Sequence, residues 1–173
     1  MQTLRRWTVT MASVAAMLSA GPAPAQDRPV VAERPASYRA LDGEWIMTGD
    51  VMGAPVTYRM QAGPTLSGAF TEIHMIDVAT PSEYEARVFL GYDQDTRTVI
   101  VHWLDSFGGK YSIPHGTGTL TDDSIQLVVP YPSGAFRDTF KYDPHEGTWL
   151  FLIEAQQPDG SWQHFARYSV HRP

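Results

Sequence analysis

The stretch 83-EYEARVFLGYDQDTRTVIVHWLD-105 contains two β-rich runs separated by turn residues. In the first run four apolar residues alternate with charged ones: Tyr84, Ala86, Val88 and Leu90 stand against Glu83, Glu85 and Arg87. Successive side chains of a strand point to opposite faces, so one face of this strand is apolar and the other is polar. The stretch therefore predicts two antiparallel strands, joined by a turn at 94–95, with one face in water.

The same unit, a short β-rich run followed by turn residues, recurs along the rest of the chain. Helical periodicity is not sustained anywhere beyond one expected turn at 36–41. Glycine, proline, aspartate and serine mark the turns between runs. The sequence predicts ten strands, at 43–51, 55–62, 65–77, 83–92, 97–106, 114–121, 124–130, 135–142, 148–156 and 161–170.

Ten strands joined by short turns form a meander with two exposed edges unless the sheet closes. We therefore expect an all-β fold, a closed antiparallel up-and-down barrel of about ten strands. A barrel of eight strands is just filled by its side chains, so ten strands should leave an internal cavity. A flattened β-sandwich is the alternative.

The N-terminus has the three parts of a secretory signal peptide. Arg5 and Arg6 precede a short uncharged run at 9–18, and Ala23 and Ala25 stand where a signal peptidase cleaves. The run is shorter than the roughly 20 residues that span a bilayer. We expect a signal peptide at 1–25, a flexible leader at 26–40, a barrel domain at 41–173 and a periplasmic or secreted protein. Alternatives are an uncleaved anchor and twin-arginine export.

Composition excludes several classes of function. The chain has 173 residues, with 13 basic and 19 acidic ones, and no cysteine. Disulfides, thiolate catalysis and cysteine-based metal sites are therefore excluded. Cleavage after residue 25 removes two basic residues and leaves 11 against 19, a net charge of −8. Such an acidic domain does not favour nucleic-acid binding, and we expect no transmembrane segment after cleavage.

Four segments carry a family resemblance. They are 41-LDGEW-45, with its Gly-x-Trp signature, 91-GYDQDTRTVIVHWLDSFGG-109, 116-GTGTL-120 and 160-GSWQHFARYSV-170. Together they resemble a bacterial family of exported lipocalin-like (calycin) barrels without an assigned function. The resemblance implies a closed barrel, an apolar ligand and no catalytic residues. It also implies that the tryptophan of the Gly43-x-Trp45 signature plugs one end of the barrel and packs on a basic residue of a late strand. We expect that residue to be Arg167.

A second resemblance concerns haem. Barrels of the nitrobindin type hold haem through a histidine near the end of the last strand, and His164 lies in the last strand here. Tyr168 follows His164 at a longer spacing than the corresponding aromatic residue in that family. We expect no cofactor and keep haem at His164 as the alternative.

The expected inward face is rich in aromatic and methionine side chains. The predicted ligand-binding residues are Tyr58, Met60, Phe70, His74, Val88, Trp103, Phe136, Phe140 and Trp149. Such a lining fits a shape-tolerant apolar pocket, and it fits a dry core equally well. The leading hypothesis is a barrel that binds a small, mostly apolar molecule.

Glu72 and His74 are the only candidates for catalysis. They share one face of the strand at 65–77, and an inward Glu beside a His would have shifted pKa values. If Ile73 and Met75 point inward instead, the pair lies in solvent, and the sequence leaves this register open. The alternative functions are therefore a cofactor-free enzyme using this pair and a filled barrel acting as an interaction module. The six histidines are dispersed, so we expect no metal site.

Overall fold

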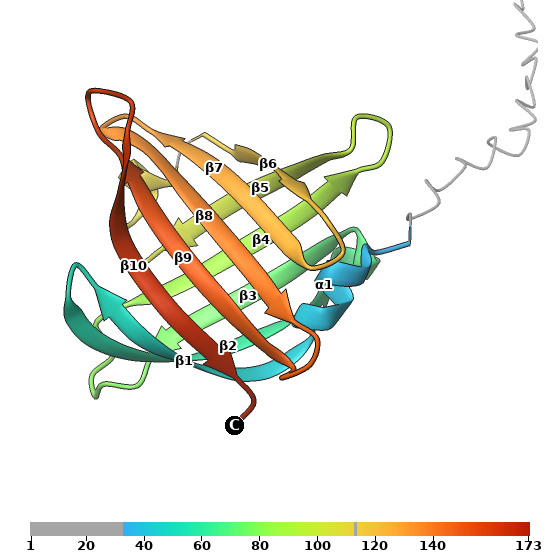
Figure 1. Ribbon diagram of the computed structural model, residues 1–173, viewed down its shortest axis with the longest axis horizontal. Helices are drawn as coiled ribbons and strands as arrows, with labels where there is room; N and C mark the ends of the chain where they lie inside the picture. Colours follow the sequence, from blue (N-terminus) through green and yellow to red (C-terminus); the bar gives the residue numbers. More distant parts are fainter. Residues whose placement is uncertain (1–32, 113) are drawn as a thin grey trace, which may run out of the picture. The chain divides into compact units, whose positions relative to one another are not determined.

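Ten antiparallel strands, each paired with the next along the chain, close into a barrel because β1 pairs with both β2 and β10 (Figure 1). The computed structural model describes residues 33–112 and 114–173. Its elements are α1 (Ala36–Leu41), β1 (Gly43–Val51), β2 (Ala54–Thr65), η1 (Leu66–Gly68), β3 (Phe70–Asp77), β4 (Glu85–Asp93), β5 (Thr98–Asp105), η2 (Gly109–Tyr111), β6 (Gly116–Leu120), β7 (Ser124–Tyr131), β8 (Gly134–Asp143), β9 (Thr148–Gln156) and β10 (Trp162–His171).

This topology confirms the predicted closed meander, and the sandwich alternative is wrong because the ten strands form one continuous ring. Each predicted strand overlaps an observed one, and the expected helical turn is α1. One predicted turn is misplaced. Gly63 and Pro64 continue β2, paired with Glu72 and Thr71. Pro64 is the second-last residue of that strand, where one missing N–H donor disturbs the ladder little.

The chain instead turns at η1, where three successive residues have positive φ. The values are 50° at Leu66, 60° at Ser67 and 88° at Gly68. Two of these residues are not glycine, so turn composition gives little sign of the bend.

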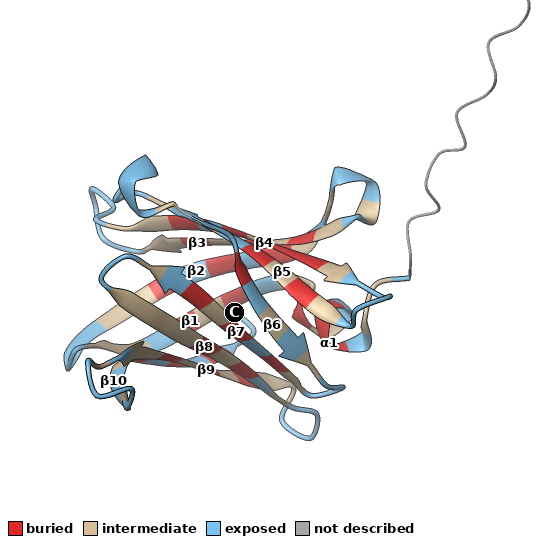
Figure 2. Ribbon diagram, turned by 90° about the horizontal axis from the view of Figure 1, so that it is seen from above, coloured by how far each residue is buried: buried red, intermediate tan, exposed pale blue. Residues whose placement is uncertain are grey.

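The core fills the barrel interior, as the alternating pattern predicts. In β1, Trp45 and Met47 are buried, while Glu44 and Thr48 on either side of them are exposed. Figure 2 shows the buried segments (red) on the strands and on α1, and the exposed hairpin loops (pale blue). Burial of these apolar side chains is the main driving force for closure.

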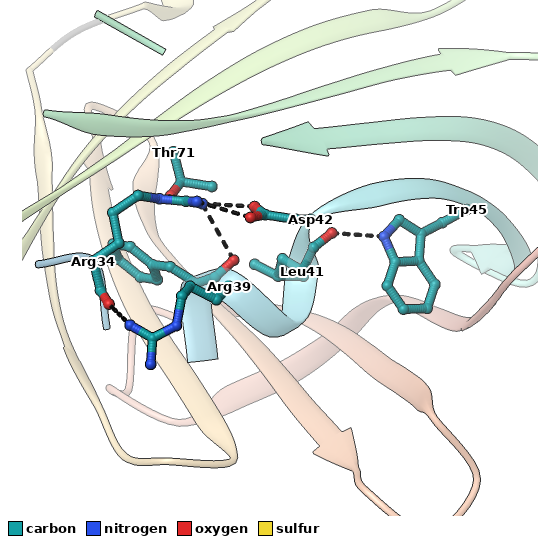
Figure 3. Close-up of polar contacts among 7 residues, drawn as sticks. Arg34, Arg39, Leu41, Asp42, Trp45 and Thr71 are labelled. Atoms are coloured by element: carbon teal, nitrogen blue, oxygen red, sulfur yellow. Dashed lines mark hydrogen bonds and ion pairs between the residues drawn. The ribbon is translucent and has the colours of Figure 1, made fainter. Parts of the chain in front are cut away.

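The helix α1 and Trp45 seal one end of the barrel, which we call the closed end. The Trp45 indole Nε1–H donates to the Leu41 carbonyl at 2.7 Å (Figure 3). The Tyr38 hydroxyl donates to the carbonyl of Gly91 at the end of β4, at 3.2 Å. Leu41, Tyr38 and Trp45 are all buried. Their side chains therefore fill the mouth of the barrel at this end.

Arg172, and not the predicted Arg167, packs on Trp45. Its guanidinium carbon lies 3.5 Å from the centre of the indole ring. Arg167 alternates with the buried Ala166 and Tyr168 in β10, so its side chain faces outward. Arg172 follows the last residue of β10 and is free of that alternation.

Gly43 of the Gly-x-Trp signature makes room for this contact. Its φ is +118°, a conformation that side chains rarely adopt, and a Cβ atom there would lie 2.2 Å from Arg172 Nη1. The signature thus combines a backbone requirement with a tryptophan plug.

A second contact holds the chain that leads into α1. Arg34 donates to both carboxylate oxygens of Asp42, at 2.8 and 2.6 Å, and to the buried Thr71 hydroxyl (Figure 3). A bidentate arginine–carboxylate pair fixes geometry as well as charge. From Arg34 onward, the segment predicted to be a flexible leader is therefore held against the barrel. The predicted signal peptide at 1–25 lies outside the described residues.

Within residues 33–112 and 114–173, no helix has the length and apolar character that a membrane crossing requires.

The cation–π contact predicts different effects for two arginines near the C-terminus. R172A should lower the free energy of unfolding by about 1 kcal/mol, because it removes the cation and uncovers Trp45. R167A removes an outward side chain and should change it by less than about 0.5 kcal/mol. Urea denaturation followed by tryptophan fluorescence measures both. Equal effects of the two variants would contradict the assignment of Arg172 to the plug.

Candidate functional site

The barrel interior changes character between its two ends. Near the closed end many inward side chains are fully buried, as at Leu90, Val99 and Ile125, while Tyr92, Leu120 and Tyr142 at its rim are half-buried. Toward the other end, several inward side chains are only half-buried. We call the inward residues at this end the open half: Tyr58, Tyr84, Trp103, Asp105, Tyr131, Phe136, Asp138 and Tyr168. Tyr58, Asp138 and Tyr168 of this group are buried, and the other five are half-buried, so water reaches part of this end.

Asp138 in β8 is a carboxyl group in the apolar wall of the open half. It retains 3% of its surface and is flanked in register by Leu127 of β7 and Ile153 of β9. Its Oδ1 atom has no hydrogen-bond partner among the described residues. Burial raises the pKa of Asp138 to about 7. Buried polar groups are normally paired, so an unpaired carboxyl oxygen here marks a site that a ligand can complete.

Asp105, at the end of β5, is the second carboxyl group of the open half. Its Oδ1 accepts the Phe107 backbone N–H at 3.0 Å, the turn role that its position predicts. Burial raises the pKa of Asp105, although hydrogen bonds from that N–H and from the Trp103 side chain oppose the change. Burial, and then the charges of Asp138 and Asp105, raise the pKa of Tyr131. Both carboxyl groups therefore act electrostatically on the same phenol.

Three further tyrosines lie together in the open half. Tyr58 contacts Tyr84 and Tyr168 edge-on, with ring centres 5.8 and 5.7 Å apart. Burial raises the pKa of all three hydroxyls. They therefore stay neutral at physiological pH, and their rings keep the electron-rich faces that attract cations.

The interior holds no positive side chain to balance the two carboxyl groups. Among the strand positions that the structure describes, lysine, arginine and histidine occur only on outward faces. Arg137, next to Asp138 in sequence, points outward and pairs with Glu154 of β9 at 2.6 Å. The open half therefore combines two acids with a neutral aromatic lining.

The structure divides the predicted ligand-binding residues into three groups. Tyr58, Trp103 and Phe136 line the open half. Met60, Val88, Phe140 and Trp149 are buried in the packed closed half, where Phe140 stacks on Phe151 with ring centres 3.9 Å apart. Phe70 and His74 lie on the outer face, where Phe70 approaches the exposed His102.

The register of β3 decides the orientation of Glu72 and His74. Ile73 and Met75 are buried, so the pair faces outward. Glu72 pairs with Arg87, and His74 pairs with Glu85 at 2.7 Å between Nε2 and Oε1. Each is held by a neighbour on β4 and not by the other, so the predicted catalytic pair is not part of the interior site.

His164 also lies on the outer face. Its Nε2 atom is 2.9 Å from the carboxylate of Asp50, and half of its side-chain surface is exposed. The residues of the described strands thus do not fit a haem held inside the barrel by His164. No group of three or more His, Asp or Glu side chains in residues 33–112 and 114–173 has the arrangement of a metal site.

The wall between β5 and β6 is short at the open half. Their pairing spans only Val99 to Val101 on β5, so the segment 102–105 extends beyond the described partners on β6. A recess over the neighbouring β4–β5 pair is lined by Glu85, Ala86, Arg87, Leu104, Asp105 and Ser106. Asp105 therefore lies at the edge of this recess.

Sequence reasoning missed Asp138, although period two assigns it to the same face as Phe136 and Phe140. The alternating aromatic residues of β8 predict an apolar inward face, and an acid between them does not fit that pattern. Tyr84, Tyr131 and Tyr168 were missed as site residues because alternation alone does not distinguish the two ends of an interior.

Comparison with known proteins identifies the family. A sequence model described as "Protein of unknown function (DUF1579)" matches residues 36–172. A search of curated protein sequences finds no significant match.

One solved structure shares the fold. The crystal structure of Rv2717c from M. tuberculosis aligns with a TM-score of 0.55 and 16% identity, over 81% of this chain and 98% of that one. At this identity the similarity shows the fold alone. A redesigned beta barrel aligns less well, with a TM-score of 0.36 and 16% identity over 82% of this chain and 99% of that one.

The buried carboxyl predicts a pH dependence of stability. Asp138 titrates near its ordinary value of about 4 in the unfolded chain and at about 7 in the folded protein. Ionisation therefore favours the unfolded state, and stability falls as the pH rises through this window. D138N removes this loss, so its stability relative to wild type should rise by up to about 4 kcal/mol between pH 4 and pH 8.

Urea denaturation at several pH values measures this difference. D122N, which changes an exposed acid, is the control and should follow wild type. A difference between D138N and wild type that is constant with pH would show that Asp138 has an ordinary pKa.

Proposed function

The chain belongs to the DUF1579 family of proteins of unknown function, and we propose that this member binds a small, mostly apolar molecule in the open half of its barrel. The single observation that carries the proposal is that the half-buried inward side chains of Trp103, Tyr131 and Phe136 lie at the same end of the barrel as a buried carboxyl oxygen, Asp138 Oδ1, that has no hydrogen-bond partner among the described residues. Apolar surface that faces inward yet remains wet is stabilised when a ligand covers it.

The closed half limits the size of the ligand. The side chains of Trp45 and Phe140 are fully packed there, each with 1% of its surface exposed. A molecule that enters from the open side therefore stops near the level of Phe140 and Phe151. Burying apolar surface contributes roughly 25 cal/mol per Å², from which the cost of ordering the ligand is subtracted. A compact aromatic or branched molecule fits this description better than a long acyl chain.

We further propose that the protein works outside the cytoplasm. The support is the arrangement of charged, apolar and small residues at 1–25, which is that of a cleavable secretory signal. A carrier that needs no cofactor suits such a compartment. N-terminal sequencing of the protein from a cell fractionation tests this part: a mature chain beginning at Gln26 supports it, and an intact chain in the cytoplasm contradicts it.

The proposed binding site predicts different effects on ligand affinity for alanine substitutions at two neighbouring residues of β5. Trp103 faces inward and Leu104 faces outward with 44% exposure. The neutral fluorescent probe N-phenyl-1-naphthylamine should bind the wild-type protein, and W103A should weaken its affinity about tenfold, because truncation removes a large aromatic contact. L104A should leave the affinity unchanged.

Fluorescence titration measures all three affinities. Equal affinities of W103A and wild type, or an equal loss in L104A, would rule out the open half as the binding site. A native mass spectrum of the purified protein provides an independent readout, because a bound non-covalent mass identifies the class of natural ligand.

A further inference from the structure

The open half has an unbalanced charge. Asp138 and Asp105 are inward carboxyl groups, and both act electrostatically on Tyr131. No lysine, arginine or histidine faces inward at the strand positions of the described chain. An occupant that carries a positive charge would offset both acids, whereas an anion would meet repulsion from both.

Asp138 offers a specific contact for such a charge. Its Oδ1 atom is fully buried and lacks a donor among the described residues, and its neighbours in register, Leu127 and Ile153, supply none. A carboxylate that gains a charged donor in an apolar surrounding forms a strong hydrogen bond. Of the groups that small organic molecules carry, an ammonium supplies both the charge and the donors.

The surrounding rings suit the same group. Tyr58, Tyr84 and Tyr168 lie in mutual edge-on contact, and Tyr131 lies edge-on to Phe136 with ring centres 5.5 Å apart. Aromatic faces attract cations and also cover apolar surface. One end of the ligand can therefore be charged while its body remains apolar.

We propose that the open half is a site for small organic amines, in which the Asp138 carboxylate binds the protonated amine and the tyrosine rings enclose the apolar body. This inference rests on the proposed function and names the chemical class of its ligand. A ligand with only a carbonyl acceptor would pair with protonated Asp138 but leave Asp105 unbalanced. Burial raises the pKa of Asp138 to about 7 in the free protein, and a nearby cation favours its ionised form.

Three probes with one apolar body and different charges test the proposal. They are 3-phenylpropylamine, 3-phenylpropan-1-ol and 3-phenylpropanoate, titrated into the full barrel by calorimetry at pH 8. The amine should bind wild type at least about tenfold more tightly than the alcohol, since a charged hydrogen bond exceeds a neutral one. The acid should bind most weakly.

Substitutions of single aspartates then show which carboxyl group causes the preference for the amine over the alcohol. D138N keeps the shape of the side chain and should reduce the ratio of amine affinity to alcohol affinity to less than about threefold. Circular dichroism and urea denaturation show whether the variant is folded. D105N should reduce the preference less, and D122N, at an exposed loop position, should leave it intact.

The outcomes separate the two proposals. If the alcohol binds as tightly as the amine, or if D138N keeps the preference, the amine site is wrong while apolar binding stands. If none of the three probes binds, both proposals are contradicted. A tighter complex with 3-phenylpropanoate would show that the open half selects anions and would overturn the role of Asp138.

Discussion

The sealed end of the barrel is the constraint on which the rest of the structure depends. A ring of ten strands encloses more space than an eight-stranded one, and side chains alone do not close both mouths. Trp45 closes one mouth because α1 supplies an acceptor for its indole N–H and Arg172 covers its ring. Gly43 permits this by its φ of +118° and its missing Cβ. With this mouth closed, the interior divides into a packed half and an open half.

The open half carries the cost of a buried acid. A carboxyl group set between Leu127 and Ile153 without a hydrogen-bond partner for Oδ1 reduces stability, and an apolar residue at that position would not. Proteins tolerate such groups mainly where activity requires them. Asp105 gives weaker support for a ligand, because its carboxylate already accepts a hydrogen bond from the Phe107 N–H in the turn. Asp138 has no comparable structural partner, so a ligand is the more direct account of its position.

The sequence predicted the architecture well and the site only in part. Period-two alternation and turn residues determine strands locally, so all ten strands and their antiparallel order follow from the chain itself. The register of the strands does not follow from local sequence, because it depends on partner strands that are distant in the chain. Only the pairing of β3 with β2 and β4 shows that Ile73 points inward and His74 outward. Likewise, alternation identifies an inward face without showing which end of it is wet. Arg172 was missed because it lies beyond the last strand, where no periodicity applies.

A direct measurement of Asp138 tests the central claim, that the open half contains an unpaired carboxyl awaiting a positively charged ligand. Carbon-13 NMR of the aspartate carboxyl resonances, assigned through D138N and D105N, follows each titration with and without 3-phenylpropylamine. The account predicts a pKa of about 7 for Asp138 in the free protein. It also predicts a decrease of at least about one unit when the amine is bound, since a nearby cation favours the carboxylate. An ordinary pKa near 4 in the free protein, or a value that the amine does not change, would contradict it.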